Sequence, residues 1–297
     1  MQSKALFKVK YAATVFSFLL PGLVLYMVFM LLPIVDTVNI SFTDWNGMRP
    51  TFNYVGIQNY ADVLTHSLFW NAMRNTLFWV VAQLIIIIFP TLLLSLAISK
   101  VRWGMTFFRA AFYMPAVISF AVAAIIWRRI YDPLFGPVNA FLNAVGLEML
   151  ALNWLGNANT VLPALVVASS WVQYGLYMVL YLAGLQSIDQ QLYEAAEIDG
   201  ANQFVKLTRI TIPALRNTIN VITSLVIINA FRGFSMVWIT TQGGPMYTSD
   251  LVATYIYRVA FTHFQTGRGT AAGVLLTFII IIVTILFNVL RERSDRR

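Results

Sequence analysis

Long runs of apolar residues without a charge constrain this chain more than any other feature of its sequence. Only 11% of its 297 residues are charged and 59% are apolar, whereas an ordinary soluble domain has about 25% charged residues. Six of the runs are close to the ~20 residues that an α-helix needs to cross a bilayer. We place these spans at 11–35, 75–99, 110–127, 161–185, 217–241 and 269–290. The sequence therefore predicts an all-α polytopic membrane protein, with six transmembrane helices in a single domain over residues 1–297.

Basic residues are unevenly divided between the two sets of loops that six spans would create. The N-terminal tail, residues 100–109, residues 186–216 and the C-terminal tail would share one side, and they hold most of the 20 Lys and Arg residues. Because loops rich in Lys and Arg stay in the cytoplasm, we expect both termini there. This topology explains the formal net charge of +8, which therefore does not indicate a nucleic-acid partner. The run at 11–35 is too long for a cleaved signal peptide, so we expect a retained first helix.

Residues suited to catalysis or metal binding are scarce. The chain has no cysteine, and its two histidines, His66 and His263, lie far apart in the sequence, so neither a metal site nor a catalytic residue is predicted. No lysine is followed by Ser or Thr, as a Walker A loop requires. We therefore do not expect an enzyme, or a cofactor held by this chain. Secondary transporters carry ionisable residues in several spans, and Arg232 is the only one inside the predicted spans, which makes that class a weaker alternative.

The predicted loop at 187–216 is longer and more acidic than a connector between two spans needs to be. Ser187 with Gln190 fits a capping box at a helix start, and Asp189 adds negative charge there. Asp199-Gly200 is typical of a helix end followed by a turn. We expect a helix, a sharp turn, a short second helix at 201–209, and re-entry into the membrane at Pro213. On spacing alone, the short helix could dock a partner or lie structurally on the membrane surface.

Three motifs in the sequence resemble those of ABC importer permeases. Glu194-Ala195-Ala196, Asp199-Gly200-Ala201, Ile210 and Pro213 match the EAA loop of that family, with Ile212 where Leu is usual. The stretches 41–47 and 55–60 resemble the first external loop of sugar permeases of the maltose-transporter type, and 241–245 resembles their T-x-GGP turn. The resemblance covers nearly the whole chain.

The resemblance implies the type I ABC importer permease fold and a set of partners in the inner membrane of a bacterium or archaeon. These partners are a second permease subunit of different sequence, two ATPase subunits that bind ATP and Mg, and an extracytoplasmic sugar-binding protein that delivers a carbohydrate. The EAA loop would insert its short helix into an ATPase subunit and couple ATP hydrolysis to transport. The residues implied in this coupling are Glu194, Ala195, Ala196, Asp199, Gly200, Ala201, Asn202, Phe204 and Lys206.

Polar side chains inside the spans are candidates for the substrate path, because they are costly in hydrocarbon unless they have a function. The resemblance places sugar contacts on the fourth and fifth spans, and the candidates there are Gln173, Tyr174, Tyr177, Asn229 and Arg232. Asn229, Arg232 and Ser235 recur every three residues, so neighbours in this series are predicted to share a helix face. Tyrosines in spans are more often packing residues than ligands. Arg232 has three open roles: extending to the interface, pairing with a carboxylate of the partner permease, or binding an acidic, phosphorylated or other non-sugar cargo.

Overall fold

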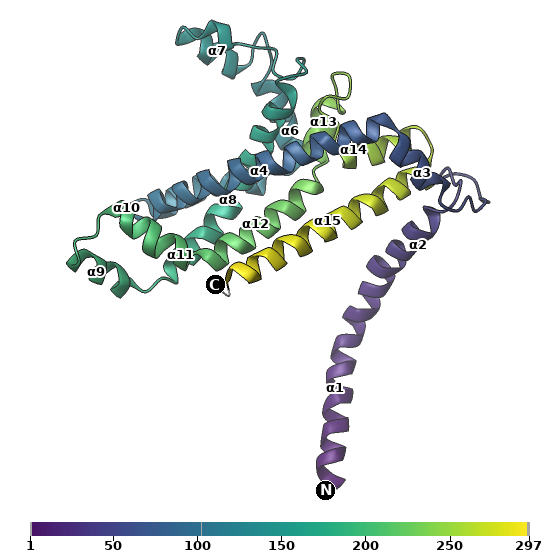
Figure 1. The fold of residues 1–297 in the computed structure, drawn as a ribbon, viewed down its shortest axis with the longest axis horizontal. Coiled ribbons are helices and arrows are strands. Elements are labelled where there is room, and N and C mark those ends of the chain that lie inside the picture. The colour runs from purple at the N-terminus through teal and green to yellow at the C-terminus, as the bar shows by residue number, and fades with distance from the viewer. Residues whose placement is uncertain (1, 102, 296–297) are drawn as a thin grey trace. The chain divides into compact units, whose positions relative to one another are not determined.

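In a computed structural model that describes residues 2–101 and 103–295, the chain consists of helices joined by loops (Figure 1). The described residues contain a single isolated β-bridge, between Thr43 and Tyr54. Contacts divide the chain into two compact units. The first comprises the segment up to Thr65 together with Ile256–Leu275, and the second comprises His66–Tyr255 together with the segment from Leu276 onward.

The first unit begins with a long apolar helix made of α1 (Gln2–Tyr26), η1 (Met27–Leu31) and α2 (Leu32–Ile40). The π-helical turn η1 ends two residues before Pro33. Proline has no N–H, and its ring crowds the carbonyl four residues earlier, so a wider turn at this point relieves the clash. Thr14–Ile40 is long and apolar enough to cross a membrane, which confirms the first predicted span.

The first unit also contains the loop from Ser41 to α3 (Gln58–Thr65), η4 (Arg258–Thr262) and the first part of α15 (Thr266–Asp295). Asn59 joins the two halves of the loop, because its Nδ2 donates to the carbonyls of Ser41 and Thr43 at 2.8 Å each. The Ser41 hydroxyl lies 2.7 Å from the Tyr60 hydroxyl. Thus the two stretches of the first-loop motif fold against each other.

The second unit is built around α4 (Ser67–Ser99), α8 (Val161–Gln186) and α12 (Arg216–Phe231), which pack against one another (Figure 1). Their contact buries an apolar cluster. Its fully buried members are Ile87, Tyr177, Tyr181, Leu215, Ile222 and Val226. Because lipid tails are as apolar as these side chains, the cluster stabilises the bundle through close packing.

The third predicted span, 110–127, is not one straight helix. α5 (Met105–Val117) and α6 (Phe120–Ile130) are bent by 100° relative to each other. Pro115 stands in the last turn of α5, and the Ser119 hydroxyl accepts a hydrogen bond from the Val122 N–H, which caps a new helix. Five helical segments of the described chain, one of them Arg216–Thr241, are long and apolar enough to span a membrane, with this bent pair as the sixth candidate.

The fifth predicted span, 217–241, is also broken. α12 ends at Phe231, and α13 (Ser235–Thr241) begins after a non-helical segment at 232–234. The predicted common helix face of Asn229, Arg232 and Ser235 is therefore wrong beyond Arg232, because Ser235 belongs to a new helix.

A compact turn follows α13 at the position predicted from the T-x-GGP motif. The buried Asn75 of α4 supports it, since its Nδ2 donates to the carbonyls of Tyr247, Thr248 and Asp250 at 3.0–3.3 Å. α14 (Val252–Tyr257) follows this turn. Between α6 and α8 lie the short helices α7 (Pro137–Ala144) and η2 (Glu148–Leu150).

Candidate functional site

The loop at 187–216 begins with α9 (Gln190–Ile198), whose N-terminal cap differs from the one predicted. Asp189 is the cap residue, and its Oδ1 accepts a hydrogen bond from the Gln191 N–H at 2.9 Å. The Ser187 hydroxyl instead donates to the Gly184 carbonyl at 2.7 Å, at the end of α8. The predicted capping box is therefore wrong, because Ser187 still belongs to the terminus of the preceding helix.

The motif residues at the end of α9 form a helix-terminating cap known as a Schellman motif. The Ala201 N–H donates to the Ala196 carbonyl at 2.8 Å, and the Gly200 N–H donates to the Glu197 carbonyl at 3.1 Å. Asp199 is the C-cap, and Gly200 has φ +74°, a conformation that only glycine adopts readily. The motif residues Ala196 and Ala201 are thus the two partners of the hydrogen bond that spans five positions. The predicted stop and turn are confirmed, and their cause is local.

The second helix of the loop, α10 (Gln203–Lys206), starts at Asn202, whose Oδ1 accepts from the Val205 N–H at 2.9 Å. It does not end near residue 209 as predicted. It continues through the π-helical turn η3 (Leu207–Thr211) into α11 (Ile212–Ala214), directly before α12. As in the first unit, the π-helical turn ends two residues before a proline, here Pro213. α10 and α12 are therefore joined in one nearly continuous helical path.

Two side-chain contacts hold α9 against this helical path. Lys206 Nζ lies 2.5 Å from Glu197 Oε1, and the Tyr193 hydroxyl lies 2.9 Å from the Thr211 hydroxyl. The Lys206 side chain is only 7% exposed, so its ammonium requires a partner, whereas Glu197 is 66% exposed. Lys206 therefore points into the loop, although the resemblance placed it among the residues implied in coupling. The sequence analysis missed the role of Glu197, although opposite charges on either side of a helix-turn-helix are a usable signal.

The loop exposes carboxylates together with large apolar side chains. Glu194 is exposed, and the structure gives it no hydrogen bond or ion pair with any described residue. Phe204 is 71% exposed and Ile198 is 88% exposed, and Ala195 is exposed beside Glu194. Large apolar groups exposed on a short polar loop are typical of a protein contact surface.

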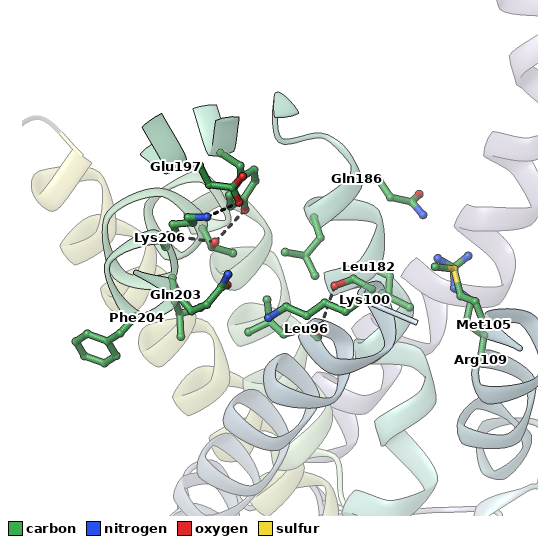
Figure 2. Close-up of a pocket in the computed structure, with 15 residues that line it drawn as sticks. Leu96, Lys100, Met105, Arg109, Leu182, Gln186, Glu197, Gln203, Phe204 and Lys206 are labelled. Atoms are coloured by element: carbon green, nitrogen blue, oxygen red, sulfur yellow. Dashed lines mark hydrogen bonds and ion pairs between the residues drawn. The ribbon is translucent and has the colours of Figure 1, made fainter. Parts of the chain in front are cut away.

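A cavity of about 730 Å³ lies between this loop and the ends of α4, α5 and α8. Figure 2 shows Lys206 directed toward Glu197 inside the loop, while the Phe204 ring points away from the other labelled side chains. Lys100 and Arg109 line the opposite wall, from the end of α4 and from α5. The loop and the bundle therefore enclose this cavity, while Ile188 and Leu215 anchor the two ends of the loop in the apolar cluster.

A second cavity, of about 380 Å³, lies between α4, α6, α8 and the break after α12. Three of the predicted path residues line it, namely Gln173, Asn229 and Arg232. Tyr177 lies behind them, fully buried, and its hydroxyl accepts from Asn229 Nδ2 at 3.3 Å. Tyr174 packs against the apolar cluster of the bundle. The structure thus brings three candidates to the cavity and places both tyrosines in supporting positions.

Gln83 is a structural partner that the sequence analysis overlooked. It is buried in α4, and its Oε1 accepts from Gln173 Nε2 at 3.2 Å and from the Ser170 hydroxyl at 3.3 Å. These bonds fix the side chain of Gln173 at the cavity wall. The signal was available, because Gln83 is a polar residue inside a predicted span.

Membrane-length helices around a cavity that carries several polar side chains, with a capped helical hairpin exposed at the end of one of them, define a membrane transport subunit. The chain belongs to the family described as binding-protein-dependent transport system inner membrane components, whose model matches residues 94–297.

Two relatives of the chain are similar over most of their length. The diacetylchitobiose uptake system permease protein NgcF of Streptomyces coelicolor is 30% identical, over 91% of this chain and 80% of the relative. The multiple sugar-binding transport system permease protein MsmF of Streptococcus mutans is 31% identical, over 91% and 92%. A chain of a bacterial alginate ABC transporter, solved with an alginate pentasaccharide-bound periplasmic protein, has the same fold. It aligns with a TM-score of 0.85 at 24% identity, over 97% of this chain and 96% of that one.

Proposed function

We propose that this chain is the permease subunit of an ATP-driven importer that receives a carbohydrate from an extracytoplasmic binding protein. The observation that carries the proposal is the capped hairpin of α9 and α10, which exposes Glu194 and Phe204 and continues through η3 and α11 into α12. Two ATPase subunits would bind ATP and Mg, and a second permease of different sequence would complete the path.

The similarity to sugar permeases supports a carbohydrate as the cargo. NgcF and MsmF, whose names refer to diacetylchitobiose and to multiple sugars, are each aligned over about nine tenths of this chain. The cavity that holds Gln173, Asn229 and Arg232 combines amide and guanidinium groups with the aromatic rings of Trp79 and Phe234. A few polar groups set in an apolar, aromatic wall are typical of small-molecule sites.

The geometry of the hairpin supports a mechanical role in coupling. The Schellman cap at Gly200 and the Lys206–Glu197 ion pair hold α9 and α10 at one relative angle. A force applied by an ATPase subunit to Phe204 would therefore move the hairpin as a unit. The movement would reach the cavity along α12, because Asn229 and Arg232 lie at the end of this helix. Movement of rigid helices is a general route for such transmission.

The distribution of Lys and Arg supports an orientation with both termini and the hairpin in the cytoplasm of a bacterium or archaeon. The apolar stretch of Thr14–Ile40 is not buried by the other described residues of this chain. Its exposed surface suits a helix that contacts lipid or the second permease.

The proposal is tested in vesicles that contain the chain with its cognate ATPase, second permease and binding protein. Gly200→Pro removes the φ +74° that the cap requires, and Glu194→Ala removes the exposed carboxylate. Gln191→Ala, an exposed position on the same helix, is the matched control. We expect binding-protein-stimulated ATP hydrolysis to fall at least tenfold in the first two variants and to stay unchanged in the control. Transport without ATP, or a chain that binds no ATPase subunit, would refute the proposal.

A further inference from the structure

Arg232 presents a cation to the cavity, and no described residue supplies a counter-ion. It lies at the break where α12 ends, its side chain is exposed to the cavity, and the structure gives its guanidinium no hydrogen bond or ion pair with any described residue. The cavity is lined by apolar, aromatic, amide and hydroxyl side chains, and no Asp or Glu is among them. A lone guanidinium inside a span is costly unless another molecule supplies the negative charge.

A neighbouring cavity of about 460 Å³ carries two more arginines, Arg128 and Arg129, with Asp132 beside them. The carboxylate of Asp132 is already in use. The N–H groups of Phe135 and Leu134 donate to it at 2.9 and 3.0 Å and, with Arg129, hold its pKa below the usual range. Arg128 is exposed and has no hydrogen bond or ion pair with the described residues.

The two cavities lie along the same pair of helices, α6 and α13, which pack against each other. Phe120, at the start of α6, and Ser235, at the start of α13, line the cavity of Arg232. Ile239, further along α13, lines the cavity of Arg128 and Arg129. From Phe120 to Arg129, α6 advances nine residues, roughly 14 Å at 1.5 Å per residue. The two cavities along α6 and α13, here called the groove, therefore both carry net positive charge: no acidic residue lines the cavity of Arg232, and Arg128 and Arg129 outnumber Asp132 in the other.

From this arrangement we infer that the cargo is an anionic sugar, one that carries a carboxylate or a phosphate, and that Arg232 binds the anion. The inference rests on the proposed import function and specifies its substrate class. A guanidinium matches carboxylate and phosphate oxygens with two parallel hydrogen bonds, which a neutral hydroxyl cannot reproduce. Arg128 and Arg129 steer the anion toward the groove, because positive charge at a mouth raises the local concentration of anions.

The nearly parallel rings of Phe234 and Trp238, with centroids 5.8 Å apart and planes 14° apart, lie next to Arg232 in the chain. Phe234 lines the same cavity. An apolar ring beside a guanidinium suits a ligand with an apolar sugar face and a charged substituent. A carboxylate of the second permease could also supply the negative charge opposite Arg232. The experiment must therefore distinguish an anionic cargo from a carboxylate of that subunit.

The test uses the complete importer in vesicles with three probes: trigalacturonate, the neutral trisaccharide obtained by reducing its carboxyl groups, and glucose 6-phosphate. The binding protein is first assayed for each probe, and uptake is then measured at saturating binding protein. We expect at least one anionic probe to be carried at least tenfold faster than the neutral trisaccharide, and the two anions distinguish carboxylate from phosphate. Arg232→Gln should lower anion uptake at least tenfold.

Two further variants define the route. Replacing both Arg128 and Arg129 with Gln should slow anion uptake mainly at low ionic strength, because salt screens steering by exposed charges. Arg74→Gln, an exposed arginine of α4 that lines neither cavity, is the matched control and should transport like the parent.

The outcomes are distinguishable. Equal uptake of charged and neutral trisaccharides, or a binding protein that carries neutral sugars alone, overturns the anionic cargo but leaves the importer intact. If Arg232→Gln prevents assembly of the two permeases with any cargo, Arg232 pairs with the partner and the inference is wrong. If no sugar of either charge is carried and ATP hydrolysis is not stimulated, the proposed function itself fails.

Discussion

A close approach of two helices in the bundle gives the sharpest prediction. At Gly175, α8 lies against α5, and a Cβ at this position would stand 2.5 Å from the Cα of Tyr113 and 2.7 Å from the carbonyl oxygen of Phe112. Both atoms belong to the backbone of α5, so no side chain can rotate out of the way. Gly175→Ala therefore has to push the two helices apart.

The size of the effect follows from these distances. Carbon atoms in contact prefer a separation of about 3.5–4.0 Å, so α5 has to move by about 1 Å. Overpacking of this kind costs about 1–3 kcal/mol. At about 1.4 kcal/mol per factor of ten, the unfolded population rises roughly 5- to 150-fold. Because α5 leads into α6, which lines both cavities of the groove, transport should fall as well.

Thermal unfolding of the purified complex, followed by intrinsic fluorescence, measures this change. Gly273→Ala in α15 is the matched control, since its Cβ would meet only Ile256 Cδ1, at an ordinary 4.0 Å. Alanine in a helix interior is favoured over glycine by about 0.5–1 kcal/mol, so the control should be as stable as the parent or more stable. If Gly175→Ala unfolds at the same temperature as the control, the close packing of α5 on α8 is wrong.

Three further predictions concern other contacts. Asn75→Ala removes the donor to three carbonyls of the turn after α13 and should cost about 1–3 kcal/mol; an unchanged unfolding temperature would show that the turn does not depend on it. Glu197→Gln leaves the Lys206 ammonium without its carboxylate but, because Glu197 is largely exposed, should cost only about 1 kcal/mol or less. Hydrogen exchange of α10 should accelerate, and adding Lys206→Met should reverse the effect; no change in exchange would mean that the pair does not hold α10. The Asn53 N–H donates to Asp44 at 2.7 Å and, with the Asn53 side chain, lowers the Asp44 pKa from 3.8. This stabilisation is present above pH 3.8 and is lost as pH falls through the lowered pKa. The Asn53 amide resonance should therefore titrate with a midpoint below pH 3.8. A midpoint above pH 3.8 would contradict the lowered pKa.

The sequence by itself determined the features whose causes are local. The first, second and fourth spans follow from hydropathy, because each apolar run must leave water whatever it packs against. The cap at Gly200 also follows from local sequence, since its two hydrogen bonds join residues three and five positions apart. The turn after α13 was likewise indicated by a short motif.

Only the tertiary structure decided the features that depend on distant segments. The helix breaks at 118–119 and 232–234 lie inside apolar runs, so hydropathy does not distinguish them from continuous helix. Tyr177 and Arg232 are both polar residues in predicted spans, yet one is buried in the bundle and the other faces a cavity. Lys206 points inward because Glu197 lies across the turn. In each case the side that a residue faces is set by which helix packs against it, and that information is not contained in the spacing of residues along one segment.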